Sequence, residues 1–174
     1  MKPLVIELHE GLPTQPMTCS RVQGTLQQVQ QEVERICEAF LGHGFPVVRV
    51  KVEAAPWNAI TPQTSRDLKT EDQNRYFEHH CKVLIPETGD LEILQQVCQG
   101  HGAHLSRNAF KTLKEGGQER FVTLRMYGVA LDQAQEQADL LRIHLEQAGF
   151  SCQKSIMEYC VLDTQIELDA GWGA

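Results

Sequence analysis

The chain has 174 residues, of which 41% are hydrophobic and 22% are charged, and this globular composition excludes a disordered chain. Its formal net charge of −7 disfavours a protein that binds nucleic acid through overall positive charge. The sequence reaches Glu7 and His9 too early for a secretory signal, and no apolar run approaches the roughly 20 residues of a membrane-spanning helix. We therefore expect one soluble, cytoplasmic domain, residues 1–174, with no membrane partner.

The first predicted helix covers about residues 25–42, where apolar residues alternate at spacings of three and four and so share one face. A shorter helix of the same pattern begins at Leu91, and a third begins at Leu131. Each pattern ends beside a glycine, and a glycine there can take the left-handed backbone conformation that closes a helix. The three endings are Leu41-Gly42-His43-Gly44-Phe45, Gln99-Gly100-His101-Gly102-Ala103 and Glu146-Gln147-Ala148-Gly149-Phe150.

Strand-like runs stand before and after each predicted helix, so the order strand, helix, strand occurs three times. The three β-α-β units cover about residues 4–54, 76–110 and 120–163. Two such units in tandem make the ferredoxin-like arrangement of α+β proteins, a mainly antiparallel sheet with its helices on one face, and the third unit would extend or flank it. A doubly wound parallel sheet is the alternative, but no helix separates one unit from the next, as that topology requires.

Two connections interrupt this internal repeat. Residues 55–75 form a long loop that carries Trp57, and loops of this length inside a compact domain are often functional. A smaller loop, about residues 112–119, contains two adjacent glycines and is predicted to be a turn.

Strand alternation predicts which side chains lie on the sheet face opposite the helices. In the run 46–54, for example, Val48, Val50 and Val52 face the helices. The side chains expected on the open face are Glu7, His9, Arg49, Lys51, Glu53, Glu78, His80, Lys82, His104, Ser106, Asn108, Thr123, Arg125, Lys154 and Glu158.

This open face is locally cationic on an acidic protein. One interpretation is a solvated sheet face whose opposite charges pair across strands. The other is a site for a small anionic ligand, covered by the loop that carries Trp57. The predicted ligand-binding residues are Lys51, Glu53, Trp57, Glu78, His80, Lys82, His104, Ser106, Asn108 and Arg125.

No cofactor or metal is expected from the histidines and cysteines. His79 and His80 are neighbours on a strand and point to opposite faces, so they cannot bind the same ion. The only side chains that could converge on one ion are Glu78 and His80, together with His104 or His9. The six cysteines have no C-x-x-C pair and no recurrent spacing, which favours reduced, buried thiols over a zinc or redox motif.

The segment His104-Leu105-Ser106 has the H-x-[ST] form found in the two-histidine phosphoesterases. Those enzymes need two such motifs and this chain has one, so His80 and His104 remain candidate acid and base residues of a diverged site. The chain has no G-x-G-x-x-G, Walker A or H-E-x-x-H motif. On the fifth predicted strand only Phe121 and Tyr127 could stack bases, which disfavours RNA binding.

Four short segments resemble a family of bacterial and plant proteins without a known activity, some of them labelled ankyrin-related. The resemblance covers about residues 48–172 and implies no activity. The ankyrin label finds no support, because the chain has neither a 33-residue repeat nor a T-P-L-H element. The segments are Tyr76-Phe77-Glu78-His79-His80-Cys81-Lys82, His104-Leu105-Ser106-Arg107-Asn108, Arg120-Phe121-Val122-Thr123 and Asp169-Ala170-Gly171-Trp172.

The sequence thus supports two functional hypotheses. The first is a protein that binds a small anionic or phosphorylated ligand on the open sheet face, with an enzyme of phosphate chemistry as one form of it. The second is an interaction or assembly module without catalysis, including a homo-oligomer, in which the charged face or a sheet edge contacts a second chain.

Overall fold

The computed structural model describes residues 1–8, 14–70, 72–85, 90–108 and 118–169. Within these residues the chain forms seven strands, three α-helices and two 3₁₀ helices. In chain order they are β1 (Lys2–Leu8), β2 (Thr14–Cys19), α1 (Leu26–Gly42), β3 (Lys51–Ala54), η1 (Asp67–Thr70), β4 (Tyr76–Ile85), α2 (Leu91–Gly100), β5 (Ala103–Asn108), β6 (Gln118–Tyr127), α3 (Leu131–Gln147), β7 (Ser151–Asp163) and η2 (Ile166–Asp169).

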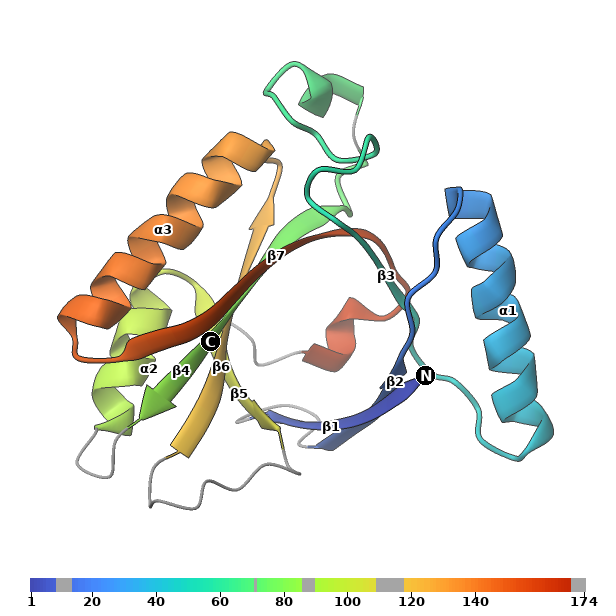
Figure 1. Cartoon of the computed structure of the whole chain (residues 1–174), viewed down its shortest axis with the longest axis horizontal. Coiled ribbons are helices and arrows are strands. Elements are labelled where there is room, and N and C mark those ends of the chain that lie inside the picture. The colour runs from blue at the N-terminus through green and yellow to red at the C-terminus, as the bar shows by residue number, and fades with distance from the viewer. Residues whose placement is uncertain (9–13, 71, 86–89, 109–117, 170–174) are drawn as a thin grey trace.

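The described strands form one curved sheet in the order β2-β1-β5-β6-β4-β7-β3, and all neighbouring strands are antiparallel. Figure 1 shows α2 and α3 on the outer, convex side of this sheet, whereas η2 lies within the arc of the strands. Helix α1 stands apart from α2 and α3, beyond the edge strands β2 and β3. No helix in the described part of the chain is both long enough and apolar enough to cross a membrane.

The predicted α+β class with a mainly antiparallel sheet is confirmed. Helix α2 joins β4 to β5, which are parallel and are separated in the sheet by β6. In the same way, α3 joins β6 to β7, which are parallel and are separated by β4. The prediction of three ferredoxin-like β-α-β units is not confirmed, because a β1–β2 hairpin precedes α1. In addition, the strands that flank α1, β2 and β3, lie at opposite edges of the sheet.

Local sequence signals account for the helix ends. Thr25 caps α1: its hydroxyl accepts from the Gln28 backbone N–H, and the Gln28 side chain accepts from the Thr25 N–H at 2.8 Å. Asp90 caps α2 by accepting from the Glu92 N–H at 2.8 Å. After α3, Gly149 has a φ of +88° and lets the Phe150 N–H reach the Leu145 carbonyl at 2.9 Å.

The hydrophobic core lies between the convex face of the sheet and helices α2 and α3. On β4 and β6 the apolar core residues occupy alternate positions, as predicted, and Tyr76, Glu78 and Thr123 on the other face are buried as well. The two helices are joined at their ends, where His101 and His144 have ring nitrogens 2.8 Å apart. The buried core includes Phe77, Cys81, Val83, Ile85, Leu94, Cys98, Val122, Leu124, Met126, Ala134, Leu141 and Leu145.

Two strand predictions need correction. The predicted strand 46–54 is shorter, because β3 begins at Lys51, and Val48, expected to face the helices, is 66% exposed. Strand β2 was not predicted, because Pro16 interrupts its pattern. A proline lacks the backbone N–H and is tolerated in a sheet at an edge, which is where β2 lies. The predicted turn at 112–119 lies mostly outside the described residues.

The long loop 55–75 contains η1 and packs against the beginning of α3. Its residues Thr61 and Pro62 are buried, and the backbone N–H of Leu131 donates to the Pro62 carbonyl at 2.9 Å. Trp57 in the same loop is 81% exposed.

Candidate functional site on the concave sheet face

The concave face of the sheet carries a network of charged side chains from β3, β4, β6, β7, η2 and the residues just before β3. We call it the charged network. Its described members, linked by ion pairs, are Arg49, Lys51, Glu53, Glu78, His80, Arg125, Glu158, Asp163 and Asp169.

Two arginines attach η2 to the sheet through Asp169, which is 4% exposed. Arg49 donates from Nη1 and Nη2 to the two carboxylate oxygens of Asp169, each at 2.8 Å, and Arg125 donates from Nη2 at 2.5 Å. Arg49 also forms two hydrogen bonds with Asp163, at 2.6 and 2.8 Å. The Gln15 side chain of β2 adds a bond to Asp169 at 3.2 Å. The carboxyl end of the described chain is therefore fixed inside the curved sheet.

Glu78 is the most deeply buried acid of the charged network, with 1% of its surface exposed. Arg125 Nε donates to Glu78 Oε1 at 2.6 Å, and the Lys51 ammonium and His80 Nε2 both contact Oε2, the latter at 3.1 Å. Burial opposes ionisation of Glu78, but the hydrogen bond with His80 and the charges of Lys51 and Arg125 hold its pKa well below the usual range. Glu78 is therefore a buried carboxylate at neutral pH.

The ring of Tyr76 lies against the basic side chains of Lys51 and Arg125. The Lys51 ammonium lies 5.7 Å and the Arg125 guanidinium carbon 5.1 Å from the centre of the Tyr76 ring, within the range of cation–π attraction. The Tyr76 hydroxyl donates to Asp163 at 2.8 Å. Lys51 further contacts Glu53 at 2.8 Å. The positions of these basic groups are thus fixed by several contacts each.

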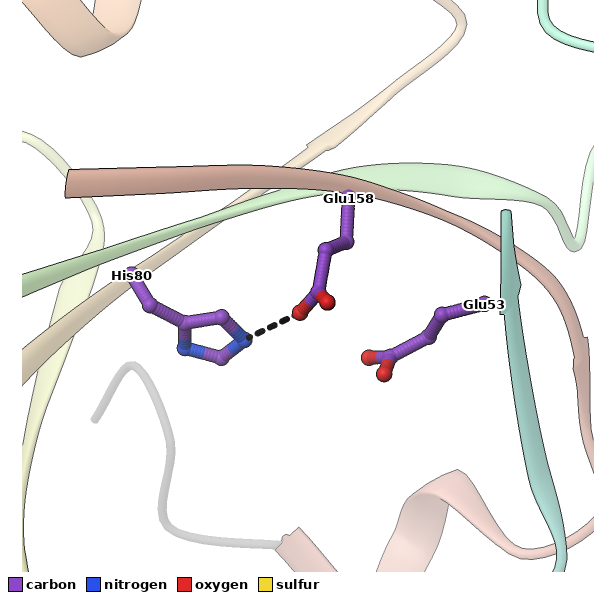
Figure 2. Close-up of side chains that lie close together, drawn as sticks. All are labelled: Glu53, His80 and Glu158. Atoms are coloured by element: carbon purple, nitrogen blue, oxygen red, sulfur yellow. Dashed lines mark ion pairs between the residues drawn. The ribbon is translucent and has the colours of Figure 1, made fainter. Parts of the chain in front are cut away.

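His80 lies between the network and the neighbouring strand β6. Its Nδ1 is 3.0 Å from the Thr123 hydroxyl oxygen, and its Nε2 is 3.7 Å from Glu158 Oε2. Figure 2 shows His80, Glu158 and Glu53 directed toward one another from β4, β7 and β3. One ligand atom from each of the three residues lies within 4.8 Å of the others. Burial and the nearby charge of Glu53 raise the pKa of Glu158 above its usual value.

His104, the second predicted histidine, lies on the same face two strands from His80. Thr123 on β6 is paired with His80 on β4 and with His104 on β5, so the two histidine backbones are separated by about 10 Å, twice the spacing of strands. Burial and the positive charge of Arg125 lower the pKa of His104 to about 4, and its ring is neutral at pH 7.

The remaining predicted site residues have different surroundings. Lys82 pairs with Glu119 at 3.0 Å on β6, and Ser106 on β5 is 9% exposed. The described contacts of the loop that carries Trp57 are with its own residues and with the start of α3. The side chain of Asn108 lies outside the described residues, as does His9.

Strand alternation predicts Arg49 and Glu158 on the open face, outside the predicted ligand-binding residues. No sequence pattern points to Tyr76, Asp163 or Asp169 as site residues. The pairing of β3 with β7 places Arg49, which lies just before β3, beside Asp163 at the end of β7, but the sequence alone does not show that pairing. Asp169 gives no signal of this kind, because it follows β7 in a short 3₁₀ helix and reaches residues more than a hundred positions away.

The charged network contains more acid than base. Its described members include five carboxylates and three permanently positive side chains. Each basic group already contacts at least two carboxylates. An added anion would therefore have to displace a carboxylate or bind together with a cation, whereas an added cation would meet an existing excess of negative charge.

The chain matches no family model, no curated protein and no solved structure in comparisons with known proteins.

Proposed function

We propose that the protein binds a small phosphorylated ligand on the concave face of its sheet. The observation that supports this proposal is the buried charged network itself. Replacing buried ion pairs with well-packed apolar residues is often neutral or stabilising, so a fold does not need such a network for its stability. Buried groups with shifted pKa values that gather on one concave surface are typical of functional sites.

The charges of the network also restrict the form of the ligand. Lys51 and Arg125 supply donors that suit phosphate oxygens, and His104 supplies a neutral imidazole. The excess of carboxylates disfavours a bare anion and favours a phosphorylated compound that brings a divalent cation, as nucleotides and diphosphates do with Mg²⁺. The role of His80 and His104 as acid and base would follow only if the bound compound reacts.

The test is a thermal unfolding experiment with inorganic phosphate, pyrophosphate and ATP, each with and without Mg²⁺, at constant ionic strength. We expect at least one of these probes to raise the melting temperature in the presence of Mg²⁺, because binding to the native state alone stabilises it. The double variant Lys51→Met/Glu78→Gln removes one charge of each sign, so the net charge is unchanged and Arg125 keeps its ion pair with Asp169, and it should abolish the shift.

The control variant is Arg35→Met, which removes a positive charge from the exposed surface of α1, where its side chain is 65% exposed. It should leave the shift unchanged. The proposal is wrong if none of the three probes stabilises the protein under either condition. It is also wrong if the double variant retains the full shift.

The second candidate function is self-assembly, and one observation on α1 favours it. Three residues of its apolar stripe, Leu26, Val29 and Val33, are partly buried against the core, but the helix has no fully buried residue, whereas α3 buries four. Phe45 and Val48, which follow α1, are 65% and 66% exposed and extend the apolar surface. A second copy of this chain could cover the same surface in a two-fold dimer, the commonest form of oligomer.

Light scattering coupled to gel filtration tests the assembly. We expect a dimer mass for the native chain and a monomer mass for Phe45→Glu. The matched control is Ile143→Glu, which places the same charge on α3 at a side chain that is 42% exposed. A monomer at every concentration would exclude this candidate.

A further inference from the structure

We propose that Glu53, His80 and Glu158 form a binding site for a divalent transition-metal ion. The proposal does not depend on the phosphorylated ligand, because it rests on these three side chains alone. They come from three adjacent strands, β3, β7 and β4, and each directs one ligand atom toward the others. All three are partly exposed, so an ion can reach them from solvent.

The distances suit a metal ion after a small adjustment. Carboxylate and imidazole ligands lie about 2.0 to 2.2 Å from such an ion, so the ligand atoms of a tetrahedral site are about 3.3 to 3.6 Å apart. The three atoms here are within 4.8 Å of one another. They need to approach by up to about 1.5 Å, which rotation of the partly exposed Glu53 and Glu158 side chains can provide.

The hydrogen bonds of His80 favour a metal ligand at Nε2. Metal-bound histidines commonly donate from the other ring nitrogen to an oxygen, which fixes the tautomer. Here Nδ1 is 3.0 Å from the hydroxyl oxygen of Thr123, a residue that is only 2% exposed. His80 Nε2 contacts Glu78 at 3.1 Å and lies 3.7 Å from Glu158. Binding of an ion would place the ring proton on Nδ1, beside the Thr123 oxygen, and leave the Nε2 lone pair for the metal.

The local charge also favours a cation. Three carboxylates, those of Glu53, Glu78 and Glu158, surround this position. Two basic side chains lie beside them. Lys51 pairs with Glu53 and Glu78, and Arg125 pairs with Glu78 and Asp169. No ion pair with Lys or Arg is found for Glu158 among the described residues.

The ligand set indicates the class of metal. One imidazole nitrogen with two carboxylates suits Mn²⁺, Fe²⁺ or Zn²⁺, whereas Mg²⁺ and Ca²⁺ prefer oxygen ligands alone. Among the described residues no thiol joins this group: Cys81 and Cys152 contact each other, and Cys160 Sγ donates to the Leu162 carbonyl at 3.4 Å. Zn²⁺ should bind more tightly than Mn²⁺ in a site of this kind.

The test is a titration of the chelator-treated full chain with MnCl₂, followed by the paramagnetic resonance signal of free Mn²⁺. We expect one Mn²⁺ bound per chain and its release when ZnCl₂ is added. Glu158→Gln and Glu53→Gln keep the size of the side chain and should each weaken Mn²⁺ binding at least about tenfold. The matched control, Glu136→Gln, changes an exposed carboxylate on α3 and should have no effect.

The proposal is overturned if Mn²⁺ and Zn²⁺ do not bind, or if both Gln variants bind Mn²⁺ as tightly as the native chain. Circular dichroism of the variants shows whether they fold, and the partial exposure of both residues makes loss of the fold unexpected. The titration contains no phosphate compound. Its failure therefore leaves the phosphorylated ligand untouched, and failure of the thermal unfolding test leaves the metal site untouched.

Discussion

The two faces of the sheet differ in the interactions that hold their side chains: one is packed with apolar residues and the other carries paired charges. Alternate residues of β4 send Phe77, Cys81 and Val83 into the apolar core on the convex side, and Glu78 and His80 into the charged network on the concave side. The apolar face loses little if one side chain is replaced by another of similar size. The charged face depends on pairing, because removal of one partner leaves the other buried and uncompensated. One strand thus contributes to the apolar core on one side of the sheet and to the charged network on the other.

The largest effect is expected from breaking a single pair on the charged face. Arg125→Met leaves Glu78, which is 1% exposed, without the guanidinium that donates to its Oε1, and should lower the free energy of unfolding by about 3 to 5 kcal/mol. The double variant Arg125→Met/Glu78→Gln should recover most of this loss. Urea denaturation measures both, with Arg142→Met on the exposed side of α3 as control. Equal losses for Arg125→Met and Arg142→Met would contradict the contrast between the two faces.

A slightly smaller effect is expected on the apolar face. Leu141→Ala removes a fully buried side chain of α3 and should lower the free energy of unfolding by about 2 to 5 kcal/mol, through lost burial and the cavity left behind. The neighbouring Leu140 is 48% exposed, and Leu140→Ala should cost less than about 1 kcal/mol. The same urea experiment compares them. If the two substitutions cost the same, the orientation of α3 on the sheet is wrong.

The smallest effect concerns the dependence of stability on pH. The pKa of His104 is about 4 in the folded chain and about 6.5 in an unfolded one, so between these values the unfolded chain binds a proton that the folded chain does not. Stability should fall as the pH decreases from 6.5 to 4, with at most about 3 kcal/mol from this residue.

His104→Gln removes this contribution and should flatten that part of the profile. Urea midpoints at pH 7, 5.5 and 4 measure it, and His43→Gln, at an exposed position after α1, is the control. Protonation of the carboxylates of the charged network also destabilises the folded chain in acid. If stability falls with pH as steeply in His104→Gln as in the native chain, these carboxylates account for the whole profile.

The parts of the fold that sequence alone predicts are those set by local patterns. The runs 76–85 and 151–163 agree with β4 and β7, and alternation on β4 and β6 separates the core side from the concave side. Alternation also predicts the part of the candidate site that lies on β3, β4 and β6, including Lys51, Glu78 and Arg125. Sequence could not show that these basic groups are paired with acids.

Convergence of Glu53, His80 and Glu158 depends on long-range pairing that no local pattern encodes. It requires β3 to pair with β7 and β7 with β4, in registers that each contain an irregularity, at Val52/Glu53 and at Lys82/Val83. A shift of one residue in either register would move a side chain to the other face. Strand order has the same origin, because the positions of β2 and β3 at opposite edges follow from tertiary packing.

Pro16 has a consequence for how the chain behaves when it is concentrated or heated. Its strand β2 is one edge of the sheet, and a proline there removes a backbone donor that an incoming strand would need. The other edge, β3, has four residues, and two of them are the charged Lys51 and Glu53. Both edges therefore resist extension of the sheet into fibrous aggregates, a protection that relies on the ends of the sheet rather than on its core.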